Sequence, residues 1–168
     1  MYESVRAPFA VFREKEDLSR GKESLSAFSR RSMGDKEDME VSVNSKNRFN
    51  QHLGIEILRQ DENGCRVALQ IRPEMFNSME GVVHGGVTAT LADVAMGHGA
   101  APHVDGVQQC VTVESRIHYL NPARGDRLEA ESHVLKRGKN LITMEARVTC
   151  DGKLVAFATG TYARVNSR

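Results

Sequence analysis

Residues 77–101 read NSMEGVVHGGVTATLADVAMGHGAA, and the rest of the chain is arranged around them. The segment begins with loop-forming residues, and a His-Gly-Gly sequence then starts a helix that we expect from about Gly85 to Ala101. Apolar residues recur along this helix at the spacing of one helical face. They are Val87, Leu91 and Val94. Asp93 is the single acid in this apolar helix, and a buried carboxylate is costly unless it is paired or hydrogen-bonded. Asp93 is therefore the first candidate for a functional residue.

Composition limits what the chain can be. It has 168 residues with 40% apolar residues, which is enough for one folded domain with some additional tail. A net charge of +1 gives no reason to expect nucleic acid or an anionic membrane as a partner. No run approaches the ~18 apolar residues that a membrane span needs, and the first residues do not resemble a secretory signal.

The cysteines and histidines indicate neither a disulfide framework nor a metal site. Cys65, Cys110 and Cys150 are isolated and odd in number, which is typical of a reducing compartment, so we expect a cytoplasmic protein. His98 and His103 have no thiolate or carboxylate at ligand spacing. The segment from Gly97 to Pro102 resembles a dinucleotide-binding loop, but it ends a helix and does not begin one. No metal and no organic cofactor is expected.

Two regions differ in composition. Residues 1–45 mix charges of both signs with serines and contain few large apolar residues, so we expect a disordered or loosely helical extension, with one candidate helix over 14–28. Residues 46–168 have the composition of a folded domain.

The folded region predicts an α+β domain, in which an antiparallel sheet of about six strands wraps around one long helix. A short helix over 47–53 comes first. Asn63-Gly64 and Asp151-Gly152 are strong signals for two-residue hairpin turns. Alternating and β-branched runs predict strands over 55–59, 65–71, 108–120, 126–136, 141–150 and 154–165. We expect the last four strands to follow one another in meander order.

This order of elements, together with a set of motifs, resembles the hotdog fold and, within it, the PaaI-type acyl-CoA thioesterases. The motifs are Asn77 with Gly81-x-x-His84-Gly85-Gly86, Leu91-Ala92-Asp93, Val111-Thr112-Val113-Glu114, Tyr119-Leu120-Asn121-Pro122-Ala123, Lys136-x-Gly138-Lys139 and Gly160-Thr161-Tyr162. The resemblance covers roughly residues 47–165. It implies hydrolysis of an acyl-CoA to a carboxylic acid and free coenzyme A, in a homodimer or a homotetramer.

The chemistry of the residues agrees with that activity. A helix that begins at Gly85 presents free backbone N–H groups and a positive dipole end, which suits a carbonyl oxygen that becomes negative. Asp93 could act as a general base toward water or as a nucleophile, and the sequence leaves both open. His84 would orient the loop or donate a hydrogen bond near the carbonyl. Thr112 resembles the family's hydroxyl position that holds the attacking water.

Other candidate residues would bind the substrate. In the family an Asn commonly lies six residues before the His, whereas here Asn77 lies seven before His84 and Ser78 holds that position. Either residue could therefore occupy the site. Gly86 would let the substrate approach the backbone closely. Arg137 and Lys139, in a charged turn, are candidate contacts for the phosphates of coenzyme A.

Helix geometry adds an inference about assembly. Residues 84 and 93 are nine apart, which at about 100° and ~1.5 Å per residue places them on opposite sides of the helix and roughly 13 Å apart along it. One carbonyl cannot contact both within one chain. If both act on one thioester, the site is shared between two chains.

Two other functions fit the same sequence. One is a hotdog dehydratase or hydratase that acts on acyl thioesters, which would need a His paired with an acid for proton abstraction. The other is a non-catalytic acyl-CoA-binding or regulatory protein, for which a buried acid such as Asp93 offers little advantage. The acyl group could be aryl or straight-chain.

Overall fold

The structure is a computed structural model, and it describes residues 47–101 and 103–165. The extension expected over residues 1–45, with its candidate helix over 14–28, lies outside the described residues.

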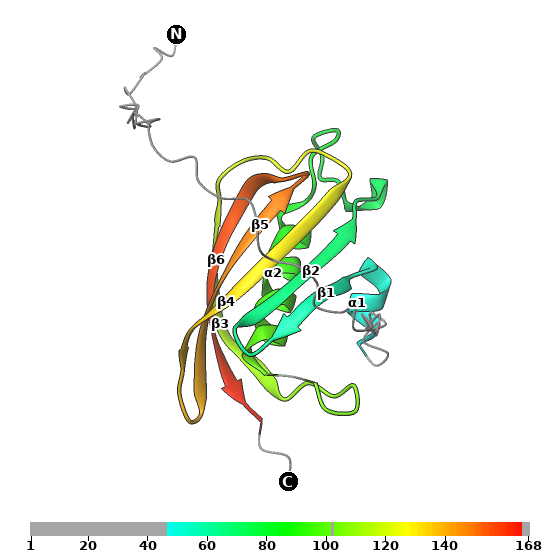
Figure 1. The fold of residues 1–168 in the computed structure, drawn as a ribbon. Coiled ribbons are helices and arrows are strands. Elements are labelled where there is room, and N and C mark those ends of the chain that lie inside the picture. Colours follow the sequence, from blue (N-terminus) through cyan, green and yellow to red (C-terminus); the bar gives the residue numbers. More distant parts are fainter. Residues whose placement is uncertain (1–46, 102, 166–168) are drawn as a thin grey trace, which may run out of the picture. The chain divides into compact units, whose positions relative to one another are not determined.

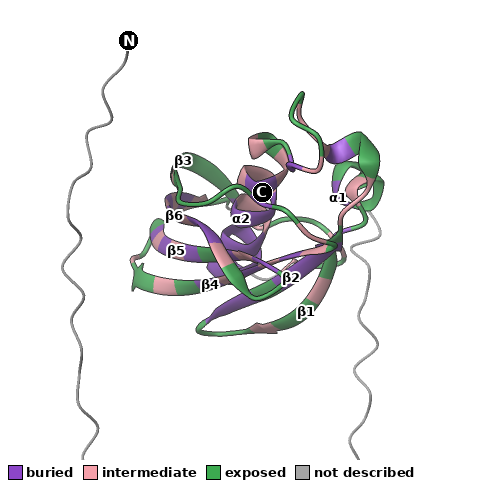
Figure 2. Ribbon diagram, turned by 90° about the horizontal axis from the view of Figure 1, so that it is seen from above, coloured by how far each residue is buried: buried purple, intermediate pink, exposed green. Residues whose placement is uncertain are grey.

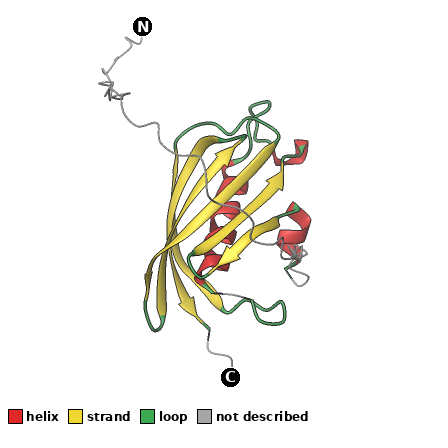
Figure 3. Cartoon of the chain, in the orientation of Figure 1, coloured by secondary structure: helices red, strands yellow, loops and turns green. Residues whose placement is uncertain are grey.

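The helices and strands lie where the sequence predicts them, with ends that differ by at most two residues. In chain order they are α1 (Arg48–Leu53), β1 (Glu56–Asp61), β2 (Gly64–Gln70), a 3-10 turn η1 (Pro73–Met75), α2 (Gly85–Ala100), β3 (Cys110–Tyr119), β4 (Arg127–Arg137), β5 (Leu141–Cys150) and β6 (Lys153–Arg164). The cap of α1 has a local cause, because the Asn47 side chain accepts a hydrogen bond from the Asn50 N–H. Figure 3 shows the connecting loops at both ends of the strands.

The strands form one antiparallel sheet in the order β1-β2-β4-β5-β6-β3. The expected meander is therefore wrong for β3, which pairs with β6 at the edge of the sheet, although β4, β5 and β6 do follow one another. The reason lies in the connections. A two-residue turn at Asp151 and Gly152 forces β5 and β6 to be neighbours. Residues 120–126, between β3 and β4, contain Pro122 and form no such turn, so they carry the chain from one side of the sheet to another.

The concave face of this sheet encloses α2, as Figure 1 shows. The C-terminal half of the helix, from Ala95 to Ala100, is entirely buried, whereas His84 and Gly86 at its beginning are exposed. Inward-facing side chains of β2, β4, β5 and β6 complete the core. Figure 2 shows this burial along α2 and the mostly exposed edge strand β3. A six-stranded antiparallel sheet around one long helix confirms the expected hotdog fold.

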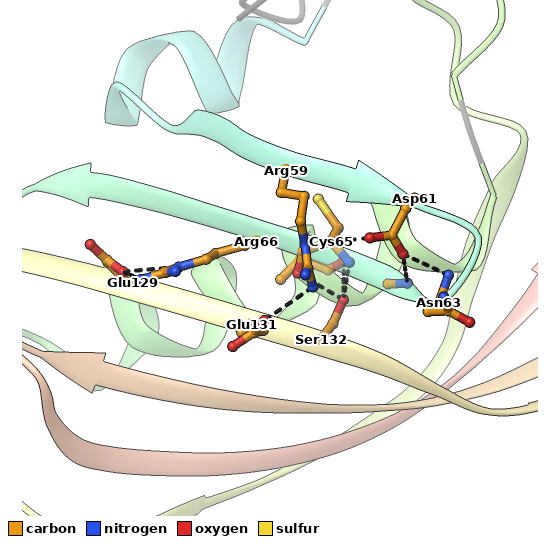
Figure 4. A network of polar contacts seen from close by, with 10 residues as sticks. Arg59, Asp61, Asn63, Cys65, Arg66, Glu129, Glu131 and Ser132 are labelled. Atoms are coloured by element: carbon orange, nitrogen blue, oxygen red, sulfur yellow. Dashed lines mark hydrogen bonds and ion pairs between the residues drawn. The ribbon is translucent and has the colours of Figure 1, made fainter. Parts of the chain in front are cut away.

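Ser132 on β4 connects the helix to the sheet. Its hydroxyl is fully buried, donates to the Ala95 carbonyl of α2 at 2.8 Å and accepts from the Cys65 N–H of β2 at 3.1 Å. The opposite face of the same strands is polar, and Figure 4 shows the Arg59–Glu131 and Arg66–Glu129 ion pairs beside this serine. The buried hydroxyl therefore holds α2 at a defined position over β2 and β4.

Candidate active site

Asp93 lies midway along α2, and two hydroxyl groups of the sheet hold its carboxylate. Its Oδ1 accepts hydrogen bonds from the Tyr162 hydroxyl at 2.8 Å and from the Thr112 hydroxyl at 3.0 Å. Thr112 on β3 and Tyr162 on β6 are register partners, so the pairing of these strands brings both hydroxyls to the same oxygen. No described residue donates a hydrogen bond to Oδ2 of Asp93. That oxygen is therefore the one available to a substrate.

Tyr162 is a site residue that we did not single out from the sequence. The signal was present, because Tyr162 follows two small residues, Ala158 and Gly160, at the inward positions of β6. Burial, and after it the charge of the Asp93 carboxylate, raises the pKa of the Tyr162 phenol. The phenol therefore keeps its proton near neutral pH and stays a hydrogen-bond donor to Asp93.

A cavity of about 360 Å³ lies beside Asp93. One of its walls is a face of α2, and the others come from α1, from the segment before β3 and from β3 itself. The lining residues that contribute to the argument are Phe49, Asp93, Val94, His98, His103 and Gln108. Asp93 therefore faces an open space large enough for a small organic group.

The beginning of α2 leaves one backbone donor free. His84 is the N-cap, and its Nδ1 accepts a hydrogen bond from the Gly86 N–H at 2.9 Å, while its carbonyl accepts from the Val87 N–H at 3.0 Å. The Gly85 N–H has no acceptor among the described residues. Because Nδ1 of His84 accepts, a neutral His84 ring carries its proton on Nε2 and can donate from there.

Gly85 faces a second cavity, of about 340 Å³, and not the one beside Asp93. Asn77 and Tyr119 also line it, and the Tyr119 hydroxyl donates to the Gly85 carbonyl at 3.0 Å. The two cavities share no lining residue. The structure thus separates Gly85 from Asp93 within one chain, as helix geometry predicts.

Asn77 and Ser78, the two candidates for the family's Asn position, lie in different surroundings. Asn77 lines the cavity of Gly85, and its Oδ1 accepts a hydrogen bond from the Met79 N–H at 2.6 Å. Ser78 is exposed and lines neither cavity described above. Of the two residues, Asn77 is the one near Gly85.

The remaining candidates lie apart from both cavities. Gly86 is exposed beside the His84 ring. The Arg137 guanidinium donates to the carbonyls of Ala100, Gly99 and Glu62 at 2.6, 3.3 and 3.0 Å, which places it at the C-terminal end of α2. Lys139 is exposed and has no hydrogen bond or ion pair to a described residue. The assignment of Arg137 and Lys139 to phosphate binding stays a prediction, and the structure gives Arg137 a second role as a helix cap.

No helix within the described residues is long and apolar enough to cross a membrane. The described residues also contain no group of three or more His, Cys, Asp or Glu side chains placed to hold a metal ion.

Comparisons with known proteins point to one family. Residues 80–156 match the model of the thioesterase superfamily. The medium/long-chain acyl-CoA thioesterase YigI of Escherichia coli K12 is 31% identical over 130 residues, which cover 68% of this chain and 83% of YigI. The solved structure of E. coli PaaI, from the phenylacetic acid degradation operon, has 26% identity and a TM-score of 0.64 over 73% of this chain and 88% of PaaI. A mutant of PaaI from Thermus thermophilus has 28% identity and a TM-score of 0.61 over 71% and 100% of the two chains.

The Arg137 cap yields a prediction about stability. Replacement of Arg137 by Met removes three hydrogen bonds from a cation to carbonyl groups, two of them at the end of α2 and one, to Glu62, in the turn between β1 and β2. We expect the free energy of unfolding to fall by about 1–2 kcal/mol, measured by urea denaturation. Lys139→Met is the matched control and should change it by less than about 0.5 kcal/mol. Equal stability of the two variants would show that the Arg137 contacts do not stabilise the helix end.

Proposed function

Because this chain is an enzyme that belongs to the thioesterase superfamily, we propose that it hydrolyses the thioester of an acyl-CoA with Asp93 of one chain and the Gly85 N–H of a second chain. The observation that carries this proposal is the state of Asp93. Its Oδ1 is fixed by Tyr162 and Thr112, and its Oδ2 is free next to an open cavity. A carboxylate held in this way is oriented in advance for reaction.

Two routes use the free oxygen of Asp93. As a general base, Oδ2 takes a proton from a water molecule whose oxygen attacks the thioester carbon; the C–S bond then breaks, and the thiolate of coenzyme A leaves and is protonated. As a nucleophile, Oδ2 attacks the carbon itself and expels the thiolate, and water then hydrolyses the resulting anhydride. Both routes pass through a negatively charged carbonyl oxygen, which the free Gly85 N–H can stabilise.

The other residues around the carbonyl support these steps. His84 can donate from Nε2, and Asn77 lines the cavity of Gly85, so we assign the family's Asn position to Asn77 and not to Ser78. The Thr112 hydroxyl donates to Asp93 and can still accept a hydrogen bond from the attacking water. Gly86 lines neither cavity, and as a glycine it leaves room for the His84 ring, whose Nδ1 a Cβ there would approach to 2.9 Å, so its contact with the substrate stays a prediction.

Two copies of the chain are needed on this account, because Gly85 and Asp93 line different cavities of one chain. The surface of β3 offers a place for the second copy. Among the described residues β3 is an edge strand whose one partner is β6, and its Val111 and Val113 side chains are 53% and 57% exposed. An unpaired edge with exposed apolar residues favours association. We therefore propose at least a homodimer with two equivalent sites.

Two further parts of the proposal concern location and the acyl group. All three cysteines are free and buried, which supports a reducing, cytoplasmic location.

YigI is named for medium- and long-chain acyl groups and PaaI for phenylacetic acid degradation, so straight-chain and aryl groups are both reasonable starting substrates.

The first prediction about activity concerns Asp93. Asp93→Asn keeps the shape of the side chain but removes the base or nucleophile, so we expect release of free thiol from aryl- and straight-chain acyl-CoAs to fall by ~100-fold or more. Asp105→Asn is the control, since Asp105 is an exposed acid in the loop before β3 and lines neither cavity. Unchanged turnover in Asp93→Asn would exclude the mechanism.

The second prediction concerns the Gly85 N–H. Gly85→Pro removes this N–H, and the first position of a helix tolerates proline. His84 has φ −60° and ψ 133°, an extended conformation that suits the residue before a proline. We expect kcat to fall by about 10²–10³, the cost of one lost oxyanion donor.

Gly85→Ala is the matched control for this experiment. A Cβ at position 85 lies 3.2 Å from the Tyr119 ring, and both alanine and proline add this atom. Alanine, however, retains the N–H. A kcat as low in Gly85→Ala as in Gly85→Pro would attribute the loss to crowding and would contradict the oxyanion role.

A further inference from the structure

Two hydrogen bonds join the edge strand β3 to His84 through a single peptide group at the beginning of α2. The Tyr119 hydroxyl donates to the Gly85 carbonyl at 3.0 Å. The Gly86 N–H, which belongs to the same peptide group as that carbonyl, donates to Nδ1 of His84 at 2.9 Å. This peptide group therefore has Tyr119 at its oxygen and His84 at its nitrogen, and a neutral His84 ring keeps Nε2–H as its remaining donor.

Hydrogen bonds at the two ends of one peptide group strengthen each other. A donor at the carbonyl oxygen makes the N–H of the same group more positive and hence a better donor, by about 10–30% per bond. The Tyr119 hydroxyl therefore strengthens the bond from Gly86 to Nδ1 of His84. The hydrogen bond at one imidazole nitrogen decides which nitrogen carries the proton, so this bond favours the tautomer of His84 with its proton on Nε2.

The rings of Tyr119 and His84 lie directly against the first two residues of α2. A Cβ at position 85 would lie 3.2 Å from the Tyr119 ring, and a Cβ at position 86 would lie 2.9 Å from Nδ1 of His84. The second distance is too short for a carbon atom, so a side chain at position 86 would displace the His84 ring. The second glycine of the His-Gly-Gly sequence is therefore explained by the position of this ring.

An irregularity in β3 brings Tyr119 to the helix. Side chains seven residues apart, such as those of Thr112 and Tyr119, point to opposite faces of a regular strand. The register of β3 shifts between Thr112 and Glu114, however, and the extra residue turns the following side chains to the other face. Thr112 can thus reach Asp93 while Tyr119 reaches Gly85. One strand supplies a hydroxyl group to each half of the proposed site.

We propose that Tyr119 is a positioning residue for the hydrolysis: through the Gly85–Gly86 peptide group it holds His84 as an Nε2–H donor for the thioester carbonyl. The proposal rests on the proposed function, in which that carbonyl lies at the Gly85 N–H. Tyr119 acts through His84 and does not take part in the chemical steps. Its role is separate from that of Thr112 and Tyr162, which hold Asp93.

Removal of the Tyr119 hydroxyl tests the first contact. Tyr119→Phe keeps the ring against Gly85 and removes only the donor. We expect kcat for acyl-CoA hydrolysis to fall by about 10-fold and KM to change by less than about 3-fold, because a misplaced group at the carbonyl slows the reaction without weakening binding. His118→Phe is the control, since this neighbouring side chain points to the other face of β3 and lines neither cavity. A kcat of Tyr119→Phe equal to that of the wild type would overturn the proposal.

A double-mutant cycle tests whether Tyr119 acts through His84. His84→Asn keeps a helix cap, because an asparagine side chain can accept from the Gly86 N–H, but it lacks the ring donor. If the contacts act together, Tyr119→Phe should lower kcat by less than about 2-fold in the His84→Asn background. An equal loss in both backgrounds would show that Tyr119 acts independently of His84, which contradicts the proposal.

A spectroscopic measurement tests the same contact without turnover. Two-bond ¹H–¹⁵N NMR spectra show which nitrogen of each imidazole carries its proton, and the signal missing from His84→Asn identifies His84. We expect the proton on Nε2 in the wild type, and we expect the ratio of the Nδ1–H to the Nε2–H form to rise by at least about 2-fold in Tyr119→Phe. Equal ratios in the two proteins, or a wild-type proton on Nδ1, would overturn the proposal.

The NMR result also separates failure of this proposal from failure of the proposed function. The expected change in the ratio without any thiol release by the wild-type protein would support the effect of Tyr119 on His84 and contradict the hydrolase. Thiol release by the wild type with equal ratios would support the hydrolase and contradict the role of Tyr119.

Discussion

The site depends on the hydrogen bonds that hold the Asp93 carboxylate. A carboxylate in a helix enclosed by a sheet is tolerated only if its charge is compensated by donors. Tyr162 and Thr112 supply these donors, and both act on Oδ1. The same arrangement that makes the acid tolerable therefore also leaves Oδ2 as the single oxygen without a described donor. The hydrogen bonds that make the acid tolerable thus also orient the oxygen that we propose as the reactive atom.

The order of the strands explains how this arrangement arises. Because β3 crosses to the far side of the sheet and pairs with β6, Thr112 lies opposite Tyr162. A β3 placed next to β4 would lose this pairing. The crossover also makes β3 an edge strand with exposed valines, which is the surface that we propose for a second copy. The position of β3 beside β6 thus orients the Asp93 carboxylate and also exposes the edge at which we propose that a second copy completes the site.

Much of the fold was readable from the sequence because its signals are local. The strands alternate, Asn63-Gly64 and Asp151-Gly152 mark turns, and one apolar helix contains a single acid, so the elements and the hotdog fold were predicted and are confirmed. The resemblance to PaaI-type thioesterases is likewise confirmed by the similarity to PaaI and YigI.

The parts that the sequence did not reveal depend on contacts between distant segments. The position of β3 was predicted wrongly, because a seven-residue connection does not force neighbouring strands as a two-residue turn does. The role of Tyr162 depends on that same pairing, and Arg137 reaches the end of α2 from a strand that is 37 residues away along the chain. Hydrogen bonds of this kind have no local sequence pattern.

The shared site is the central claim, and mixed oligomers test it most directly. We would co-express equal amounts of the Asp93→Asn and Gly85→Pro chains and measure thiol release. A mixed dimer places both defects in one site and leaves the other site intact, so random pairing should restore about a quarter of wild-type turnover, although each variant alone is nearly inactive. Turnover no higher than that of the separate variants would contradict a site built from two chains.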